Sequence, residues 1–187
     1  MPQIFIIIIA LILSLFFHSS IFAQNAEQKT QDLIAALAKT KYKKKEKKNF
    51  SFESYIDVKS EAVIKNNIQD YAGVYQSPEA NCQLNLRVSA DGKVDGIGHD
   101  YDFDSSRKQN FTLRDARIEG ALLTATKVFA DGSTKKLEAV FNNRTITEGK
   151  NPNEINSRQT KYGLGFVESV KFGDGIATSR FFLEFQP

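Results

Sequence analysis

The sequence predicts an all-β fold, an antiparallel meander of about eight strands that closes into a small barrel, preceded by an N-terminal helix. Apolar and polar residues alternate over most of the stretch from Tyr71 to Phe141, which is typical of strands with one buried face. The alternation breaks at Asp91-Gly92, Glu119-Gly120 and Asp131-Gly132, and such pairs favour tight turns between antiparallel strands. About eight strands of this length are enough to close a small barrel.

Residues 1–23 are predicted to be a secretory signal peptide. A continuous apolar run extends from Ile4 to Phe17, and small and polar residues follow it up to Ala23. The run is shorter than the about 20 residues that a membrane-spanning helix needs, and its position fits a signal peptide. We therefore expect cleavage after Ala23 or Gln24 and a secreted or periplasmic protein. Because no Lys or Arg precedes the run, an uncleaved anchor is the alternative.

Residues 24–50 are predicted to form a helical, lysine-rich tail or linker. Asn25 is a suitable helix N-cap. Leu33, Ile34 and Leu37 fall on one helical face, which indicates a narrow apolar stripe. We expect this helix to continue to about Lys48.

The segment Lys39–Lys48 carries the chain's excess positive charge. It holds seven lysines and one glutamate, whereas the rest of the chain has 18 basic and 21 acidic residues. Such a run is either a solvated helix end, which the helix dipole favours, or a contact for an anionic surface such as lipid head groups or polysaccharide. No nucleic-acid partner is expected, because Tyr42 is the only aromatic residue in the run that could stack on bases.

Residues 51–187 are predicted to be the β-barrel domain. Phe52–Val58 alternates weakly and is expected to be an edge strand, and a short helix starting at Ser60 would plug one end of the barrel. Glu148–Lys161 is polar and is expected to be a loop. Barrel strands are predicted at residues 72–77, 82–90, 93–99, 109–118, 121–129, 134–145, 160–169 and 178–186.

The expected turns fix a register and therefore an inner face of the barrel. A two-residue turn at Asp91-Gly92 places His99 opposite Leu84, and the other two turns follow the same rule. Some apolar residues then fall on the outer face, so we expect either a bulge near Asp115 or coverage of both faces. The polar residues that this register turns inward include Asp95, His99, Tyr101, Thr124 and Thr126.

Several features occur in a fixed order between about Ile64 and Val128. They are a short helix, Gly73-Val74-Tyr75 in the first barrel strand, Leu84-Asn85-Leu86, and the hairpin at Asp91-Gly92. This order resembles that of the lipocalin-like barrel domains of secreted bacterial proteins, some of which are appended to serine-hydrolase domains. The resemblance implies a lipocalin-like antiparallel barrel. Since the chain has no Trp, Gly73-Val74-Tyr75 stands in place of the Gly-X-Trp signature of true lipocalins, and no functional residue is carried over.

The inward polar residues form the predicted ligand-binding site, in an otherwise apolar interior. His99 is the sole histidine of the expected mature chain, and we expect it to orient a ligand or, alternatively, to lie at a solvated strand end. The residues predicted to bind the ligand with it are Tyr101, Asp95, Thr124 and Thr126.

Two other kinds of site around His99 are alternatives: a calcium site and a nucleophilic dyad. Asp100, Asp102 and Asp104 would offer oxygen ligands to calcium, although they lack the Gly and the closing Glu of an EF-hand. Cys82 and His99 would form a nucleophilic dyad, but the sequence shows no oxyanion hole. Cys82 is the only cysteine, so no intramolecular disulfide forms, and a buried filler role is expected. We predict no catalytic residue, metal site or cofactor.

The sequence thus favours an exported, non-enzymatic β-barrel protein that binds a small apolar or amphipathic ligand. The alternative is an envelope-associated interaction protein that uses Lys39–Lys48 on an anionic surface and has a fully packed barrel. The barrel interior separates the two, because a ligand pocket needs several hundred Å³.

Overall fold

A computed structural model describes residues 24–47, 50–78, 81–102, 107–172 and 175–187. The expected signal peptide lies outside this part of the chain. A helix covers residues 24–37, and a single 3₁₀ turn, η1, covers Ile68–Tyr71. The strands are β1 (Lys39–Lys47), β2 (Phe50–Ala62), β3 (Gly73–Gln76), β4 (Gln83–Val88), β5 (Val94–Asp102), β6 (Arg107–Glu119), β7 (Leu122–Phe129), β8 (Thr134–Asn151), β9 (Glu154–Phe172) and β10 (Gly175–Gln186).

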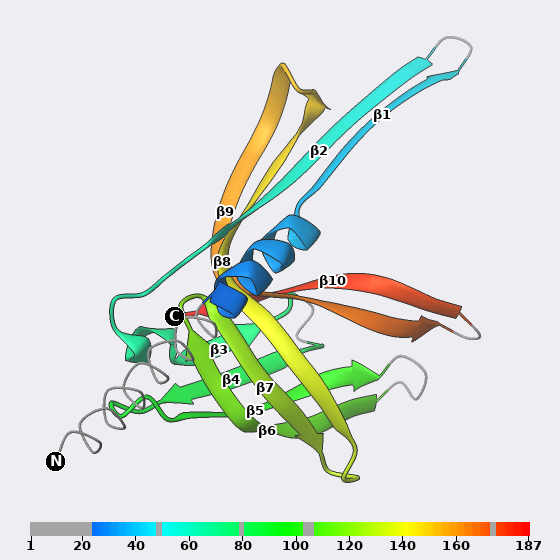
Figure 1. Cartoon of the computed structure of the whole chain (residues 1–187). Helices are drawn as coiled ribbons and strands as arrows, with labels where there is room; N and C mark the ends of the chain where they lie inside the picture. The colour runs from blue at the N-terminus through cyan, green and yellow to red at the C-terminus, as the bar shows by residue number, and fades with distance from the viewer. Residues whose placement is uncertain (1–23, 48–49, 79–80, 103–106, 173–174) are drawn as a thin grey trace, which may run out of the picture.

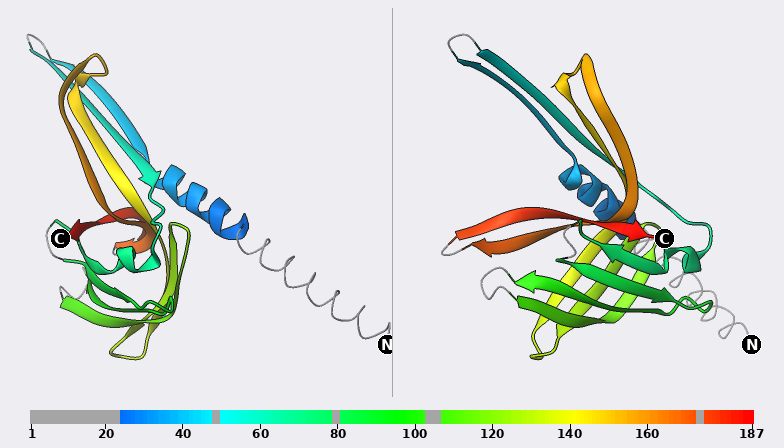
Figure 2. Two further views of the ribbon diagram at one scale, coloured as in Figure 1. Left: turned by 90° about the vertical axis from the view of Figure 1, so that its left-hand side faces the viewer. Right: turned by 180° about the vertical axis from the view of Figure 1, so that it is seen from behind.

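Eight of the described strands form a closed antiparallel barrel (Figure 1). Their order around the barrel is β8-β7-β6-β5-β4-β3-β10-β9, and β9 pairs with β8 to close it. Figure 2 shows the same wall from two further sides, with β3 to β7 below the arm and the helix. The predicted all-β antiparallel barrel with an N-terminal helix is confirmed.

A four-stranded arm extends from one end of the barrel. β8 and β9 have 18 and 19 residues, far longer than the usual strand of about five or six, and their outer halves pair with each other beyond the barrel. β2 continues this sheet on the other side of β8, and β1 pairs with β2. The arm stands clear of the barrel in Figure 1.

Three predictions for this part of the chain were wrong. The expected edge strand Phe52–Val58 belongs to β2, which lies between β1 and β8. Lys39–Lys47 is strand β1 rather than helix, and most of Glu148–Lys161 belongs to β8 and β9 rather than to a loop. A helix would bring lysines four residues apart, such as Lys39 and Lys43, into contact, whereas lysines on one face of a strand are about 7 Å apart. The outer halves of β8 and β9 are polar on both faces, so they show no apolar alternation.

The register of the β4–β5 hairpin differs from the prediction by one residue, since Leu84 pairs with Gly98 rather than with His99. The Ser89 N–H donates to the Lys93 carbonyl at 2.9 Å, so three residues form the connection. Gly92, the last of them, has a left-handed φ of 82°. Loops of this kind are the next most common hairpin connection after two-residue turns. A slip of one residue moves every side chain of β5 to the opposite face.

The same three-residue connection occurs at Asp131-Gly132. There the Phe129 N–H donates to the Ser133 carbonyl at 2.9 Å, and Ala125 pairs with Leu137. The side chains of β7 are therefore also reversed relative to the prediction: Leu123 and Ala125 face the core.

The β6–β7 hairpin confirms the bulge that was expected near Asp115. Asp115 has a φ of 54°, and the register shifts between Arg114 and Arg117. The turn itself lies at Gly120-Ala121, one residue later than predicted. The inward and outward positions of β6 are therefore exchanged between the part of the strand before the bulge and the part after it.

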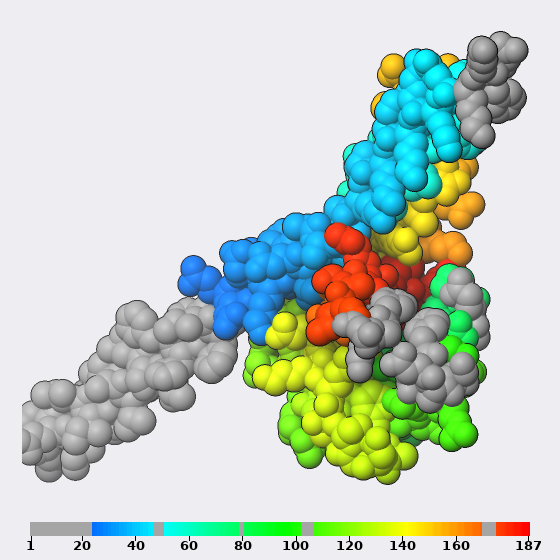
Figure 3. Space-filling model, turned by 90° about the vertical axis from the view of Figure 1, so that its right-hand side faces the viewer, coloured from blue at the N-terminus to red at the C-terminus, as the bar shows by residue number. Residues whose placement is uncertain are grey.

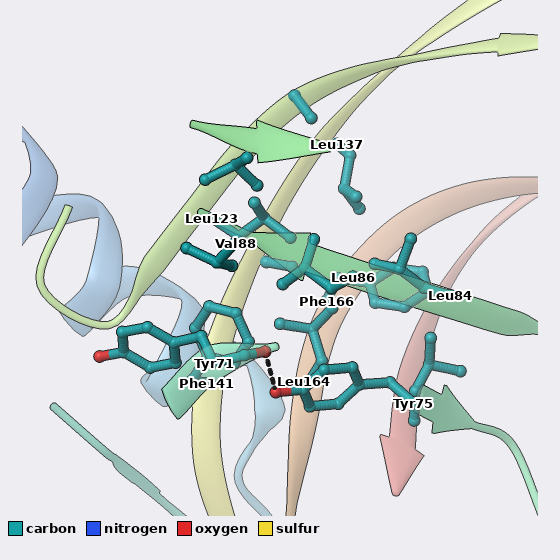
Figure 4. Packing of buried hydrophobic residues seen from close by; sticks show 14 of the residues in the cluster. Tyr71, Tyr75, Leu84, Leu86, Val88, Leu123, Leu137, Phe141, Leu164 and Phe166 are labelled. Atoms are coloured by element: carbon teal, nitrogen blue, oxygen red, sulfur yellow. Dashed lines mark hydrogen bonds between the residues drawn. The ribbon is translucent and has the colours of Figure 1, made fainter. Parts of the chain in front are cut away.

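One apolar cluster fills the middle of the barrel. The Tyr71 ring stacks on Phe141 with ring centroids 4.2 Å apart, and its hydroxyl donates to the Gly120 carbonyl at 2.7 Å. Figure 4 shows the Tyr75 hydroxyl bonded to the Tyr71 carbonyl, at 2.7 Å. The short helix predicted before the first barrel strand is present as η1, although it starts at Ile68 rather than at Ser60, which belongs to β2.

The N-terminal helix packs against the outside of the barrel. Leu37 forms a second buried cluster with Ala121 and Val140, and Leu33 and Ile34 pack against it. The apolar stripe of the helix thus covers the outer face of β8 and the β6–β7 turn. The end of this helix and the start of β1 lie where the arm leaves the barrel (Figure 3).

Candidate functional site

The predicted inward orientation of the site residues is wrong. The neighbours of these residues take the inward positions, because both hairpins are shifted by one residue. A Cβ atom on Gly98 would lie 2.7 Å from the Phe111 ring, and Leu123 is fully buried. The residues that lie on the outer face instead are Asp95, His99, Tyr101, Thr124 and Thr126.

The outer positions also separate the predicted residues from one another. An open groove of about 560 Å³ runs over the outer surface of β4 to β7; its lining includes His99, Asn85, Ile97, Asn110 and Val128. Asp95 instead forms an ion pair with Lys93 at 3.4 Å, and Thr124 accepts a hydrogen bond from Arg117 Nε at 3.2 Å. The groove therefore gathers His99 with amide side chains but with neither Asp95 nor Thr124.

The two alternative chemistries near His99 are divided between the two faces of the sheet. Cys82 packs against the core, and burial raises the pKa of its thiol. Asp100 points inward, where its carboxylate accepts a hydrogen bond from Lys127, and the side chains of Asp102 and Asp104 lie outside the described residues. No described group of three or more His, Cys, Asp or Glu residues is arranged to hold a metal ion.

Inside the barrel, Lys127 is buried between carboxylates and aromatic rings. Its Nζ lies 2.7 Å from Asp100 Oδ2 and 3.4 Å from Glu168 Oε1. The ring centroids of Phe111 and Phe166 are 4.9 and 5.2 Å away. Glu168 also pairs with Lys135, so two lysines balance two carboxylates and this network leaves no unbalanced charge for a ligand.

A separate cavity of about 270 Å³ lies outside the barrel wall. It forms where the helix, the base of the arm and β10 meet, a junction visible in Figure 3. We call it the basic cavity. The residues that line it are Leu37, Lys39, Val58, Ser60, Asn142, Arg144, Thr178, Arg180, Phe181 and Phe182.

The strand register explains why these side chains converge. Ser60 on β2 pairs with Arg144 on β8, so both side chains project from the same face. On β10, Phe181 and Leu183 turn toward the core, and the alternation of a strand then sends Arg180 outward. The helix ends at residue 37, and β1 begins at Lys39, so the start of β1 lies at the rim of the cavity.

Three cations line the basic cavity, and no carboxylate does. Lys39, Arg144 and Arg180 take part in none of the salt bridges among the described residues. Arg180 Nε donates a hydrogen bond to the Ala36 carbonyl at the end of the helix. The Arg144 guanidinium lies 5.3 Å from the centroid of the Phe182 ring. The two guanidinium groups are thus held in place by neutral groups.

Burial and neighbouring positive charge lower the pKa values of two of these cations. Burial lowers the pKa of the Arg144 guanidinium, and no carboxylate offsets this effect. The charge of Lys41 is the main cause that lowers the pKa of Lys39, followed by desolvation, with a further contribution from the charge of Arg180. An anion in the cavity would oppose each of these shifts.

The floor of the cavity contains a buried amide with one unmatched atom. Asn142 is 1% exposed, and its Nδ2 donates to Ser60 Oγ at 2.5 Å. Its Oδ1 is buried and has no hydrogen-bond partner among the described residues. With the amide turned over, the Ser60 hydroxyl would donate to Oδ1 and Nδ2 would become the unmatched donor. An unmatched buried group costs about 1–3 kcal/mol, so a hydrogen-bonding ligand would remove a destabilising feature.

Sequence reasoning missed the basic cavity because its lining comes from the helix and four separate strands. One of these strands, β1, was predicted to be helical, which placed Lys39 in the middle of a helix. The signal that the sequence does offer is a polar outer face on β8 and β10, where Asn142 and Arg144, and Thr178 and Arg180, are each two residues apart. Nothing in the sequence indicates that these two faces adjoin.

The chain matches no protein-family model, no curated protein and no solved structure. Within the described residues, no helix has the length and apolar composition needed to cross a membrane. A function for the chain must therefore be proposed from the chemistry of its own surfaces.

Proposed function

We propose that the protein is an exported, non-enzymatic β-barrel protein that binds a small amphipathic anion in the basic cavity. The observation that carries this proposal is the set of three cations without a carboxylate partner, placed beside apolar walls. Arginine side chains recognise carboxylates through paired, charge-assisted hydrogen bonds. Export is inferred from the apolar run that begins at Ile4.

The lining divides the ligand into a charged head and an apolar body. Arg144 and Arg180 flank the head, and the amide of Asn142, turned over so that Nδ2 is the unmatched group, offers it a hydrogen-bond donor at the floor. Leu37 and Val58, both buried, offer the apolar contact. At about 270 Å³ the cavity is at the small end of ligand pockets, so a short alkyl chain or a single ring with one negative group suits it.

This proposal moves the ligand from the barrel interior to the junction of the barrel and the arm. A purely apolar ligand would cover the half-buried Arg144 guanidinium further without a counter-charge, which is unfavourable. Lys39 and Arg180 are exposed. The lining contains no carboxylate, His or Cys side chain, which leaves Lys39 as its one candidate general base. These observations favour binding of an intact anion over its chemical conversion.

Calorimetric titration with three ligands of equal chain length tests the proposal: octanoate, octan-1-ol and octylammonium at neutral pH. Octanoate is expected to bind at least about tenfold more tightly than octan-1-ol, because each hydrogen bond to a charged group contributes about 1.5–3 kcal/mol. Octylammonium is expected not to bind. Equal affinity for octanoate and octan-1-ol would contradict the proposal.

Two arginine variants locate the octanoate site. Arg180→Gln should weaken octanoate binding by about ten- to a hundredfold through loss of one charge-assisted interaction. The matched control is Arg158→Gln, which removes the same charge from an exposed position on β9 outside the cavity. Circular dichroism shows whether each variant is folded. Equal losses in the two variants would mean that net charge, and not the cavity, attracts octanoate.

A further inference from the structure

One face of the arm combines lysines with exposed apolar side chains. Lys41 pairs with Ile56, Lys43 with Ser54 and Lys45 with Phe52, so each pair projects from the same side of the β1–β2 hairpin. The three lysines are exposed, and Phe52 and Ile56 are 59% and 41% exposed. We call these six residues the lysine face.

The carboxylates of the hairpin all lie on the face opposite the lysine face. Lys44, which lies on the opposite face, pairs with Glu46 at 3.1 Å and Glu53 at 3.8 Å. None of the six residues of the lysine face is acidic, and the nearest carboxylate on that side of the sheet is on β8, where Glu148 pairs with Ile56. The three lysines take part in no salt bridge among the described residues. This arrangement was not predicted, because the segment was expected to be a helix. A helix would distribute the lysines around its circumference.

We infer that the lysine face docks on an anionic phospholipid bilayer. Lysines spaced about 7 Å apart along a strand can each meet a different head group, and the anionic surface attracts each of them. Phe52 and Ile56 project beside them and would enter the boundary between head groups and acyl chains. A charged polymer such as a polysaccharide offers the negative charge but no apolar layer for Ile56. The bilayer therefore matches both halves of this surface.

This inference goes beyond anion binding in the basic cavity and does not depend on it. The two surfaces adjoin, since Lys39 lines the cavity and the lysine face continues along the same strand. The variants used below leave Lys39, Arg144 and Arg180 in place. A cavity variant such as Arg180→Gln, which is expected to lose octanoate binding, should therefore still bind the bilayer.

Cosedimentation of the full chain with vesicles tests the inference. Vesicles of phosphatidylcholine with phosphatidylglycerol should bind the protein at physiological salt, and vesicles of phosphatidylcholine alone should not. The triple variant Lys41→Gln, Lys43→Gln, Lys45→Gln should lower the partition coefficient by roughly a hundredfold, about fivefold for each lysine. The matched control removes three exposed barrel lysines, Lys93, Lys108 and Lys136, and should change the partition far less.

A second variant separates a bilayer from other anionic partners. Phe52→Ser with Ile56→Ser should lower vesicle binding by about tenfold while retention on a heparin column stays unchanged. Vesicle binding that survives this double change would overturn the inference in favour of an anionic polymer. The inference also fails if the triple lysine variant of the arm and that of the barrel lower vesicle binding equally. It fails, too, if the arm triple only causes self-association, since edge-strand lysines can serve solely to prevent it.

Discussion

At the scale of single residues, the space left by two strand glycines decides which side chains of β5 reach the core. An Asp-Gly pair suits both a two-residue turn and the end of a three-residue connection, so the local sequence is compatible with two registers. The deciding information lies elsewhere: Gly96 and Gly98 leave room for Leu113 and Phe111 on β6. Because this evidence comes from residues on another strand, inspection of the turn alone could not reveal it.

The register makes a direct prediction for Gly98. A Cβ atom there would lie 2.1 Å from the Gln83 backbone carbonyl and 2.7 Å from the Phe111 ring, so Gly98→Ala should destabilise the protein by about 1–3 kcal/mol. Ile97→Ser, one residue away on the outer face and 52% exposed before the change, should alter stability by less than about 0.5 kcal/mol. Urea denaturation measures both. If Ile97→Ser destabilised the protein more than Gly98→Ala, the result would instead support the two-residue turn and an inward His99.

At the scale of elements, the strands with one buried face were predictable and the polar ones were not. β7 and the start of β8 show clear apolar alternation, and both were predicted close to their observed bounds. The outer half of β9 is supported only by pairing with β8, so its sequence carries no sign of a buried face. The helix was predictable up to Leu37, because its apolar stripe ends there.

The helix is expected to contribute to stability rather than to be a separable tail. Leu37 is buried against Ala121 and Val140, so Leu37→Ala should lower the free energy of unfolding by about 2–4 kcal/mol. Ala35, exposed on the same helix, provides the control: Ala35→Ser should change stability by less than about 0.5 kcal/mol. Urea denaturation followed by circular dichroism checks both variants. If Leu37→Ala were equally silent, residues 24–37 would be a dispensable extension of the barrel.

At the scale of the whole molecule, the barrel is a packed support for the surfaces around it. Tyr75 and Phe141 are fully buried in its middle, and Lys127 is held there by carboxylates. The predicted site residues do not face this interior, and the ligand site that we propose is the basic cavity outside the wall. The architecture was predictable from repeated turn signals. The cavity was not, because it depends on how the helix, the arm and β10 meet, and no short stretch of sequence encodes that junction.

The location of bound octanoate tests the central claim most directly. Intermolecular nuclear Overhauser effects between octanoate and the methyl groups of the protein report which side chains the alkyl chain contacts. Binding in the basic cavity predicts contacts to Leu37 and Val58, and none to Val128 in the outer groove or Leu84 in the barrel interior. Contacts to Leu84 or Val128 without contacts to Leu37 would contradict the claim, since they would place the ligand inside the barrel or beside His99.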